Sequence, residues 1–392
     1  MAYYRMHIAM IGQKGMPAIH GGVEQHVDGL SRRLVQHGVQ VTVYARKWYA
    51  QDMVTDIEGV HIQYVPTIHT KHLDAIVHTL FATIHAIRSQ VDIIHYHGVG
   101  PSLLSWIPRV FASHIRIITT FHSIDRKHQK WNGIARLMLR FGEWTACQFA
   151  HKTIAVSRTI QQYARDVYDA HAEYIPNAVA LRPKTAETNR IRAWSLTPQK
   201  YVLMVSRLIP HKGAHYLIDA WKRIQEKNPK LLAGMKLVIV GDGYYTDTYV
   251  EALHAQAEDM PDVVFMGFQS GETLHQLYSH ARFAVHPSDN EGLPIVVLEA
   301  MSYGLPVLVS DILEHRDLIT DTAYQFTAGS IDDLAKKMSD LIETDVRILA
   351  TVGEEHKHTI EKEYEWNKIV ASLVHVYTEE QAKKNEYIFA TR

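Results

Sequence analysis

Two glutamates eight residues apart, Glu291 and Glu299, lie just after a predicted strand at 282–286. Pro294 suits the first turn of a helix, so residues 291–293 would lie beside backbone N–H groups that have no partner within the helix. Such groups can hold a diphosphate, and a carboxylate little more than a turn further on can accept both hydroxyls of a ribose. The segment therefore predicts a nucleoside diphosphate site; for either glutamate alone, a helix-capping carboxylate is an equally good interpretation.

Two cations, Arg207 and Lys212, follow a predicted strand at 201–206. Open α/β sheets bind ligands at the carboxyl ends of their strands, so these side chains could neutralise a diphosphate leaving group without a metal ion. The alternative for each is a solvated loop charge. The sequence contains no D-x-D triplet, no His-Glu-x-x-His and no pair of Cys-x-x-Cys motifs, so it predicts no metal site and no cofactor.

A glycine-rich loop follows the first predicted strand, with Gly12, Gly15, Gly21 and Gly22 ahead of a helical pattern that includes Glu24. Glycines at a strand-to-helix turn let backbone amides approach an anion, although each glycine by itself indicates only a tight turn. The loop is not a G-x-G-x-x-G fingerprint, and residues 46–47 after the second strand are basic rather than acidic, which disfavours NAD.

Histidines occupy a second strand end. His122 follows a predicted strand at 115–121, where a catalytic side chain of a parallel sheet would lie. His95 and His97 alternate on another strand, which permits metal ligation; the absence of a third ligand at a telling spacing favours ordinary packing, with His97 lining a ligand site. For His122 a structural role remains an equal alternative.

The elements that position these residues form two series of short apolar runs alternating with amphipathic stretches, which indicates two doubly wound parallel sheets. The predicted strands are 7–12, 39–45, 60–65, 91–97, 115–121, 152–156 and 173–176, then 201–206, 236–241, 263–267, 282–286 and 306–310. A polar stretch at 180–200 separates the series. We expect an N-terminal Rossmann-like domain at 1–180, a second at 181–365, and a last helix at 366–392 that crosses back to the first.

The amino-acid composition limits the classes of protein to which the chain can belong. The chain has 392 residues, 46% of them hydrophobic, and a net charge of -1, so no global field argues for nucleic acid. A single cysteine, Cys147, excludes an internal disulfide, and the start does not read as a secretory signal. No apolar run approaches the length of a membrane span. We expect a cytoplasmic protein.

With these residues in view, the chain resembles glycosyltransferase family 4. Ser206-Arg207 with Lys212-Gly213, and Glu291-Gly292-Leu293 with Glu299, carry the resemblance, and the paired glutamates are its most specific part. It implies a GT-B fold and a metal-independent, retaining transfer from a nucleotide diphosphate sugar, whether UDP-, GDP- or dTDP-linked, to a glycan, lipid-linked or small-molecule acceptor.

The resemblance also implies roles for single residues. Arg207 and Lys212 would grip the diphosphate, Glu299 the ribose, and Glu291 the sugar or its phosphate side. From its position after a strand, we expect His122 to form a hydrogen bond to the transferred sugar and steady the transition state. The remaining residues would complete the two binding sites: Gly21, Gly22, Gly292 and Leu293 on the donor side, and Glu24, His97 and Asp125 on the acceptor side. Related enzymes often have aspartate directly after this histidine, whereas here Ser123 and Ile124 intervene.

A subgroup pattern, Gly-x-x-Gly-x-Pro followed by Gly-Gly-x-Glu, resembles enzymes assigned to rhamnosyl and other glycosyl transfer in surface polysaccharides; it is met here between Gly12 and Glu24. Two other functions stay open: a non-catalytic nucleotide-sugar binding module, and a nucleotide-sugar epimerase or phosphorylase on the same frame.

Residues 126–144 combine five Lys and Arg side chains with apolar residues at helical spacing, and the only acid among them is Glu143. A basic amphipathic helix of this kind can lie on an anionic membrane, here the inner face, which would suit a lipid-linked acceptor. The alternative is a helix whose apolar side packs on the sheet.

Overall fold

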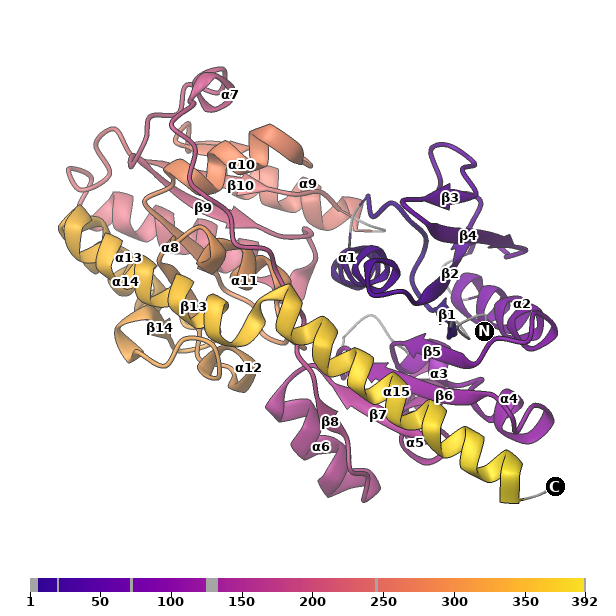
Figure 1. Cartoon of the computed structure of the whole chain (residues 1–392). Helices are drawn as coiled ribbons and strands as arrows, with labels where there is room; N and C mark the ends of the chain where they lie inside the picture. The colour runs from indigo at the N-terminus through magenta and orange to yellow at the C-terminus, as the bar shows by residue number, and fades with distance from the viewer. Residues whose placement is uncertain (1–5, 20, 71–72, 125–132, 244–245, 391–392) are drawn as a thin grey trace. The chain divides into compact units, whose positions relative to one another are not determined.

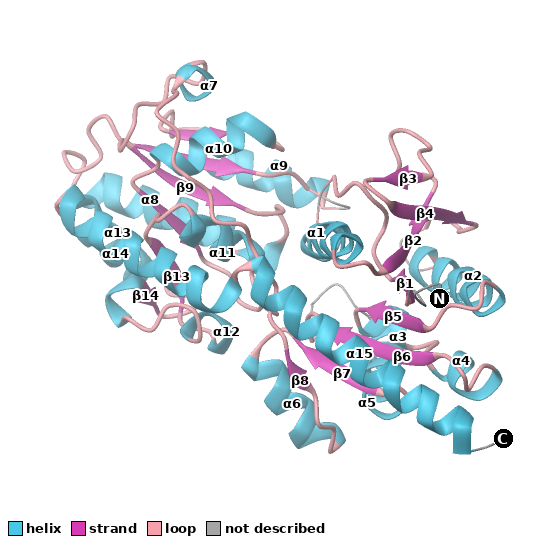
Figure 2. Ribbon diagram, in the orientation of Figure 1, coloured by secondary structure: helices cyan, strands magenta, loops and turns pink. Residues whose placement is uncertain are grey.

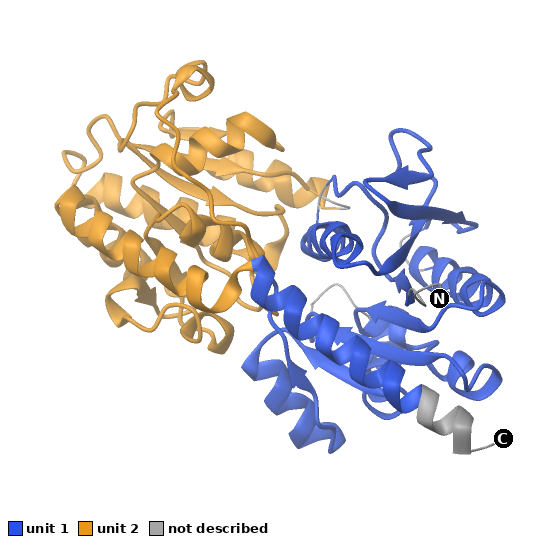
Figure 3. Cartoon of the chain, viewed as in Figure 1, with its two compact units in different colours: residues 1–178, 366–392 blue, residues 179–365 orange. Residues whose placement is uncertain are grey.

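The computed structural model describes residues 6–19, 21–70, 73–124, 133–243 and 246–390. Within it the chain forms two compact units, residues 1–178 with 366–392 and residues 179–365, each built on its own sheet (Figures 1 and 3). Asp125 and the first part of the basic segment, residues 126–132, lie outside the described residues.

The first unit is an eight-stranded sheet in the order β3-β4-β2-β1-β5-β6-β7-β8, parallel except for the β3–β4 pair. Its strands are β1 (His7–Ile11), β2 (Gln40–Arg46), β3 (Asp56–Ile57), β4 (Val60–Val65), β5 (Ile93–His97), β6 (Arg116–Phe121), β7 (Lys152–Ala155) and β8 (Glu173–Tyr174). Its helices are α1 (Gly22–Gln36), α2 (Asp74–Arg88), α3 (Val99–Ser102), α4 (Trp106–Phe111), α5 (Gly133–Gln148), α6 (Arg158–Tyr168) and α15 (Trp366–Ala390).

The second unit is a six-stranded sheet in the order β11-β10-β9-β12-β13-β14, with all pairs parallel. Its strands are β9 (Tyr201–Val205), β10 (Lys236–Val240), β11 (Val263–Phe265), β12 (Phe283–His286), β13 (Val307–Ser310) and β14 (Gln325–Phe326). Its α-helices are α7 (Asn189–Arg192), α8 (Ala214–Lys227), α9 (Asp247–Gln256), α10 (Gly271–His280), α11 (Ile295–Ser302), α12 (Leu313–Arg316), α13 (Ile331–Glu343) and α14 (Val346–Thr359). Single turns complete it at η2 (Pro210–Lys212), η3 (Thr322–Tyr324) and η4 (Ile360–Tyr364).

Both sheets follow from their sequences. The strands are nearly continuous apolar runs because helices cover both faces of each sheet, as Figure 2 shows, and their side chains are almost all buried. Every predicted strand is present, and the two-domain α/β fold is confirmed. The two-residue strands β3 and β14 were not predicted, because a run that short has no detectable period.

The last helix, α15, completes the first unit. Its apolar positions, which include Ile369, Leu373 and Tyr377, are buried, and it packs against α1 and β6. At its start the indole of Trp366 fills the space beside Gly29, where an added Cβ would come within 2.5 Å of the ring. The predicted apolar face of the final helix is therefore confirmed, and it is covered by the N-terminal unit.

Candidate functional site

The carboxyl ends of β9 and β12 lie at the point where the strand order of the second sheet reverses. Ligands of open α/β sheets bind at such switch points. The loop after β9 carries Arg207 and Lys212, and the loop after β12 carries Glu291. Arg207, Lys212 and Glu291 therefore lie at the same edge of the second sheet, as the sequence predicted.

A glycine brings these two loops together. Gly213 has φ +75°, and a Cβ placed on it would lie 2.1 Å from the carbonyl oxygen of Pro287. The backbone N–H of Asp289 also donates to the carbonyl of His211 at 2.9 Å. Only glycine allows this backbone conformation and this approach together, so Gly213 sets how close Lys212 can come to the second loop.

Lys212 and Glu291 form a partly buried ion pair, with Nζ 2.5 Å from Oε1. His286, the last residue of β12, donates from Nε2 to the same oxygen at 2.8 Å. Burial by itself raises the pKa of Glu291, but the nearby ammonium and the hydrogen bond from His286 outweigh it, so the pKa lies well below its usual range. Glu291 is therefore an anion held in place by two donors.

A second histidine, His315, lies close to His286 and Glu291. Among the described residues His315 accepts no hydrogen bond at Nε2, which is buried, while its Nδ1 lies 2.9 Å from the carbonyl oxygen of Ser310. Ring nitrogens of His286 and His315 and a carboxylate oxygen of Glu291 lie within 4.8 Å of one another. Sequence reasoning missed both histidines; the position of His286 at a strand end could have signalled it, whereas His315 comes from α12 and carries no local signal.

Glu299 lies in a different environment. It is partly buried one turn into α11, where the hydroxyl of Tyr278 on α10 donates to Oε2 at 3.4 Å. Burial raises the pKa of Glu299 to about 7, against smaller opposing effects from Tyr278 and the charge of Arg182. The two glutamates thus differ chemically: one is fixed as an anion, and the other titrates near neutral pH.

The remaining donor-side residues frame these groups. Gly292 and Leu293 are buried between the glutamates, whereas Arg207 is exposed at the start of its loop. The helix begins at Ile295, so Pro294 is the residue before the first turn rather than within it. This corrects the predicted helix start by one position and leaves residues 291–293 directly ahead of the helix N-terminus.

The N-terminal glycine loop of the first unit is arranged around its own glutamate. Gly21, with φ +106°, precedes α1, which begins at Gly22. The carboxylate of Glu24 accepts from the backbone N–H of Lys14 at 3.2 Å, and a Cβ on Gly21 would lie 2.0 Å from its other oxygen. Glu24 therefore holds the loop in place through its carboxylate. If Glu24 also binds an acceptor, the same carboxylate must contact both the loop and the acceptor.

Four histidines meet at the carboxyl ends of β5 and β6. Nδ1 of His97 lies 3.3 Å from Nε2 of His122, and the ring of His26, from the first turn of α1, packs edge-on against His122. His95 stacks near His97 and is held by Tyr377 and by the hydroxyl of Thr120. The sequence shows no third ligand at a telling spacing because His26 and His122 reach His97 from other elements.

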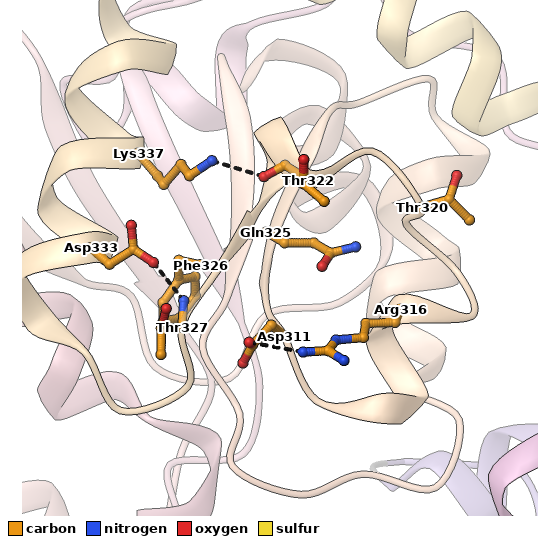
Figure 4. A pocket seen from close by; sticks show the side chains of 9 residues that line it. All are labelled: Asp311, Arg316, Thr320, Thr322, Gln325, Phe326, Thr327, Asp333 and Lys337. Carbon is orange, nitrogen blue, oxygen red and sulfur yellow. Dashed lines mark hydrogen bonds and ion pairs between the residues drawn. The ribbon is translucent and has the colours of Figure 1, made fainter.

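A cavity of the second unit lies away from these residues. It measures about 540 Å³ and is lined by residues of α12, β14, α13 and the loops between them (Figure 4). Its charges already have partners: Arg316 pairs with Asp311 at 3.1 Å, Asp333 accepts from the backbone N–H of Thr327, and Lys337 donates to the carbonyl of Thr322. We assign no role to this cavity.

Family comparisons match each unit separately. Residues 20–182 match the model described as Glycosyltransferase Family 4, and residues 187–366 match Glycosyl transferases group 1. This chain is a GT-B glycosyltransferase of the family 4 type. The two matches leave out residues 1–19, a short connection at 183–186, and residues 367–392, which include all of α15 except its first residue.

Full-length relatives carry the same class of name. The transferase is 26% identical to an uncharacterized glycosyltransferase of Methanocaldococcus jannaschii, over 95% of this chain and 98% of that protein. It is 25% identical to a GDP-mannose-dependent alpha-(1-6)-phosphatidylinositol monomannoside mannosyltransferase of Mycobacterium tuberculosis, over 91% of this chain and 94% of that protein.

Solved structures share the fold of the transferase. Sucrose-phosphate synthase from Thermosynechococcus elongatus superposes with a TM-score of 0.82 at 20% identity, over 97% of this chain and all of that one. Anabaena HepE in complex with UDP-glucose superposes with a TM-score of 0.78 at 20% identity, over 96% of this chain and all of that one. In the described part of the transferase, no helix is both long and apolar enough to cross a bilayer.

Proposed function

We propose that the transferase moves a sugar from a nucleotide diphosphate donor to an acceptor hydroxyl without a metal ion and with retention of anomeric configuration. The observation that carries this proposal is the Lys212–Glu291 pair at the switch point of the second sheet. HepE, which shares the fold, is titled as a complex with UDP-glucose, and the mycobacterial relative is named as GDP-mannose-dependent. Both names support a nucleotide sugar as donor.

The donor side follows from the charges. Lys212 has three N–H donors, so it can keep Glu291 while it binds a diphosphate oxygen, and Arg207 adds a second cation from the same loop. The N–H groups ahead of α11 contribute at Gly292 and Leu293. Glu299 in its ionised form accepts the ribose hydroxyls. The cations stabilise the charge that develops on the leaving phosphate, which is the function that a metal ion serves in other transferases.

On the acceptor side, the role that we assign to His122 is a hydrogen bond to the transferred sugar as positive charge develops on it. The pKa of His122 is held well below its usual range, first by burial and then by the neighbouring histidines, so the ring is neutral at pH 7. The acceptor hydroxyl would transfer its proton to the departing phosphate on the same face, which retains the configuration. His97 holds the ring of His122 in place through the 3.3 Å contact.

The test starts with thermal unfolding in a panel of nucleoside diphosphates and nucleotide sugars. A ligand at a hundred times its Kd raises the free energy of unfolding by about 2.7 kcal/mol, and Lys212→Met should lower that gain while an exposed control, Lys222→Met, keeps it. The anomeric configuration of the product, read by NMR, then tests retention. Binding without transfer or donor hydrolysis would identify a binding module instead, and interconversion of the donor sugar would identify an epimerase.

We also propose that α4 and α5 contact an anionic membrane surface, which suits a lipid-linked acceptor on the inner face. The apolar stripe of α5 does not pack on the sheet: Leu137 is 69% exposed, and Met138, Phe141 and Trp144 are exposed beside it. The short helix α4 adds Phe111 at 72% exposure, and the hydroxyl of Ser105, just before α4, donates to the carbonyl of Thr145 on α5.

Among the described residues of α4 and α5, the exposed charges have one sign. Arg109, Arg136 and Arg140 are exposed on the two helices. The acid of α5, Glu143, is buried and accepts hydrogen bonds from two tyrosine hydroxyls of α6. Apolar side chains flanked by arginines and without an exposed acid fit a bilayer with anionic headgroups.

Co-sedimentation with phosphatidylcholine vesicles, with and without phosphatidylglycerol, tests this contact. Each arginine near the surface contributes about 1 kcal/mol, so Arg136→Gln with Arg140→Gln should weaken binding roughly 30-fold, and Phe141→Ser should weaken it at any salt concentration. Ile348→Ser, at an exposed apolar residue of α14 in the other unit, is the matched control. Equal sedimentation with and without the anionic lipid would contradict the proposal.

A further inference from the structure

Three histidines of the first unit have the geometry of a metal site. His26, His97 and His122 come from α1, the end of β5 and the end of β6, and one ring nitrogen of each lies within 4.8 Å of the others. All three side chains are buried. A tetrahedral zinc ion about 2.0–2.1 Å from each ligand separates two ligand nitrogens by roughly 3.3 Å. Nδ1 of His97 and Nε2 of His122 are already 3.3 Å apart.

The third ligand has a nitrogen to offer. In the part of the chain that the structure describes, Nδ1 of His26 is buried without a hydrogen-bond partner. A buried polar atom in that state is costly, and a bound ion or water is the usual reason for keeping one. The ring of His26 lies 5.1 Å from that of His122 and 5.8 Å from that of His97, centroid to centroid, so it closes the triangle.

Neighbouring residues hold the imidazole rings in fixed orientations, as the binding of a metal ion requires. Nε2 of His97 lies 3.4 Å from Sδ of Met10, which suits the tautomer that leaves Nδ1 as a lone pair. His95 packs against His97 and is itself fixed by hydrogen bonds to Tyr377 and Thr120. Such second-sphere contacts orient metal-binding histidines.

The three donor atoms also suit one class of metal ion. Neutral imidazoles are ligands without deprotonation. The set contains no carboxylate and no thiolate, which disfavours magnesium and calcium and fits zinc, cobalt or nickel.

We propose that His26, His97 and His122 bind a divalent transition-metal ion such as Zn²⁺ through three imidazole nitrogens. The ion replaces the shared proton between His97 and His122, and His122 shifts to the tautomer that frees Nε2. The site is not needed for transfer. This expectation rests on the role proposed above for His122: a bound ion slows transfer because the ring then no longer forms its hydrogen bond to the sugar.

Calorimetric titration of the chelator-treated, untagged full-length chain with Zn²⁺, and absorption spectra with Co²⁺, test the site. We expect one tight site with the visible absorption of four-coordinate cobalt. Loss of one outer-sphere partner weakens a metal site by 10–100-fold, so loss of a ligand in His26→Phe should weaken Zn²⁺ binding by more than about 100-fold. The matched control is His78→Phe, at a buried histidine of α2 that does not belong to the cluster.

The outcomes separate this site from the proposed function. Tight binding that His26→Phe abolishes and His78→Phe retains supports the site. No tight binding by the folded wild-type chain, or equal binding by both variants, overturns it. The effect of Zn²⁺ on the transfer rate, measured for each variant relative to the same variant without metal, then tests the role of His122 in transfer. Inhibition by Zn²⁺ that His26→Phe relieves supports that role. Tight Zn²⁺ binding without inhibition supports the metal site but contradicts the role of His122.

Discussion

Glu299→Gln should make the transferase more stable at neutral pH while it weakens donor binding. The pKa of Glu299 is about 7 in the folded chain, against 4.5 for an ordinary glutamate. Between these values the folded state holds a proton that the unfolded state has lost, so stability falls as the pH rises from about 4.5 to 7 and stays level above. A shift of about 2.5 units corresponds to roughly 3 kcal/mol, and partial exposure of the side chain reduces this to about 2–3 kcal/mol.

Glutamine cannot ionise, so the variant keeps that free energy at every pH. The difference in melting temperature between variant and wild type should be near zero at pH 4.5 and should rise to roughly 4–12 °C by pH 8. Thermal unfolding followed by circular dichroism across this range measures it, with Glu343→Gln at an exposed position of α13 as the control. A difference that is independent of pH, or a variant that is less stable at pH 8, would refute the reasoning.

Three further predictions concern the two sites. Lys212→Met should lower kcat/KM by about 10–100-fold, because a hydrogen bond to a charged group is worth about 1.5–3 kcal/mol; kinetics at unchanged KM and kcat would contradict it. His122→Ala should lower kcat by roughly 100-fold or more while the Kd for the nucleoside diphosphate, measured by calorimetry, stays the same; an equal loss in both would point to a structural role. Gly213→Ala should cost more than about 2 kcal/mol in urea unfolding, since its Cβ would meet the Pro287 carbonyl at a positive φ, and a wild-type midpoint would show that the loops can separate.

Sequence reasoning succeeded where a signal is local. The strands have continuous apolar runs, and the donor residues follow two of those runs directly, so the strand order alone brings Lys212 close to Glu291. The apolar face of α15 was visible for the same reason. Local periodicity and strand ends therefore predicted the fold and the sheet edge at which Lys212 and Glu291 lie, but not the ion pair between them.

The features that the sequence could not show depend on contacts between distant elements. His26 and His122 are ninety-six positions apart, and nothing in either neighbourhood indicates that both approach His97. Nor could spacing show that Glu291 is held as an anion while Glu299 titrates near neutral pH, because Lys212 and His286 lower the pKa of the first carboxyl, whereas burial raises the pKa of the second. Burial and partners, rather than residue type, determine these states.

The position of α15 has a consequence for the order of folding during synthesis. Residues 1–178 emerge from the ribosome long before Trp366 and Tyr377, which cover α1 and hold His95. The intervening residues 179–365 form a complete sheet without help from either end of the chain. The N-terminal unit therefore keeps one apolar face uncovered until the residues of α15 have been synthesised.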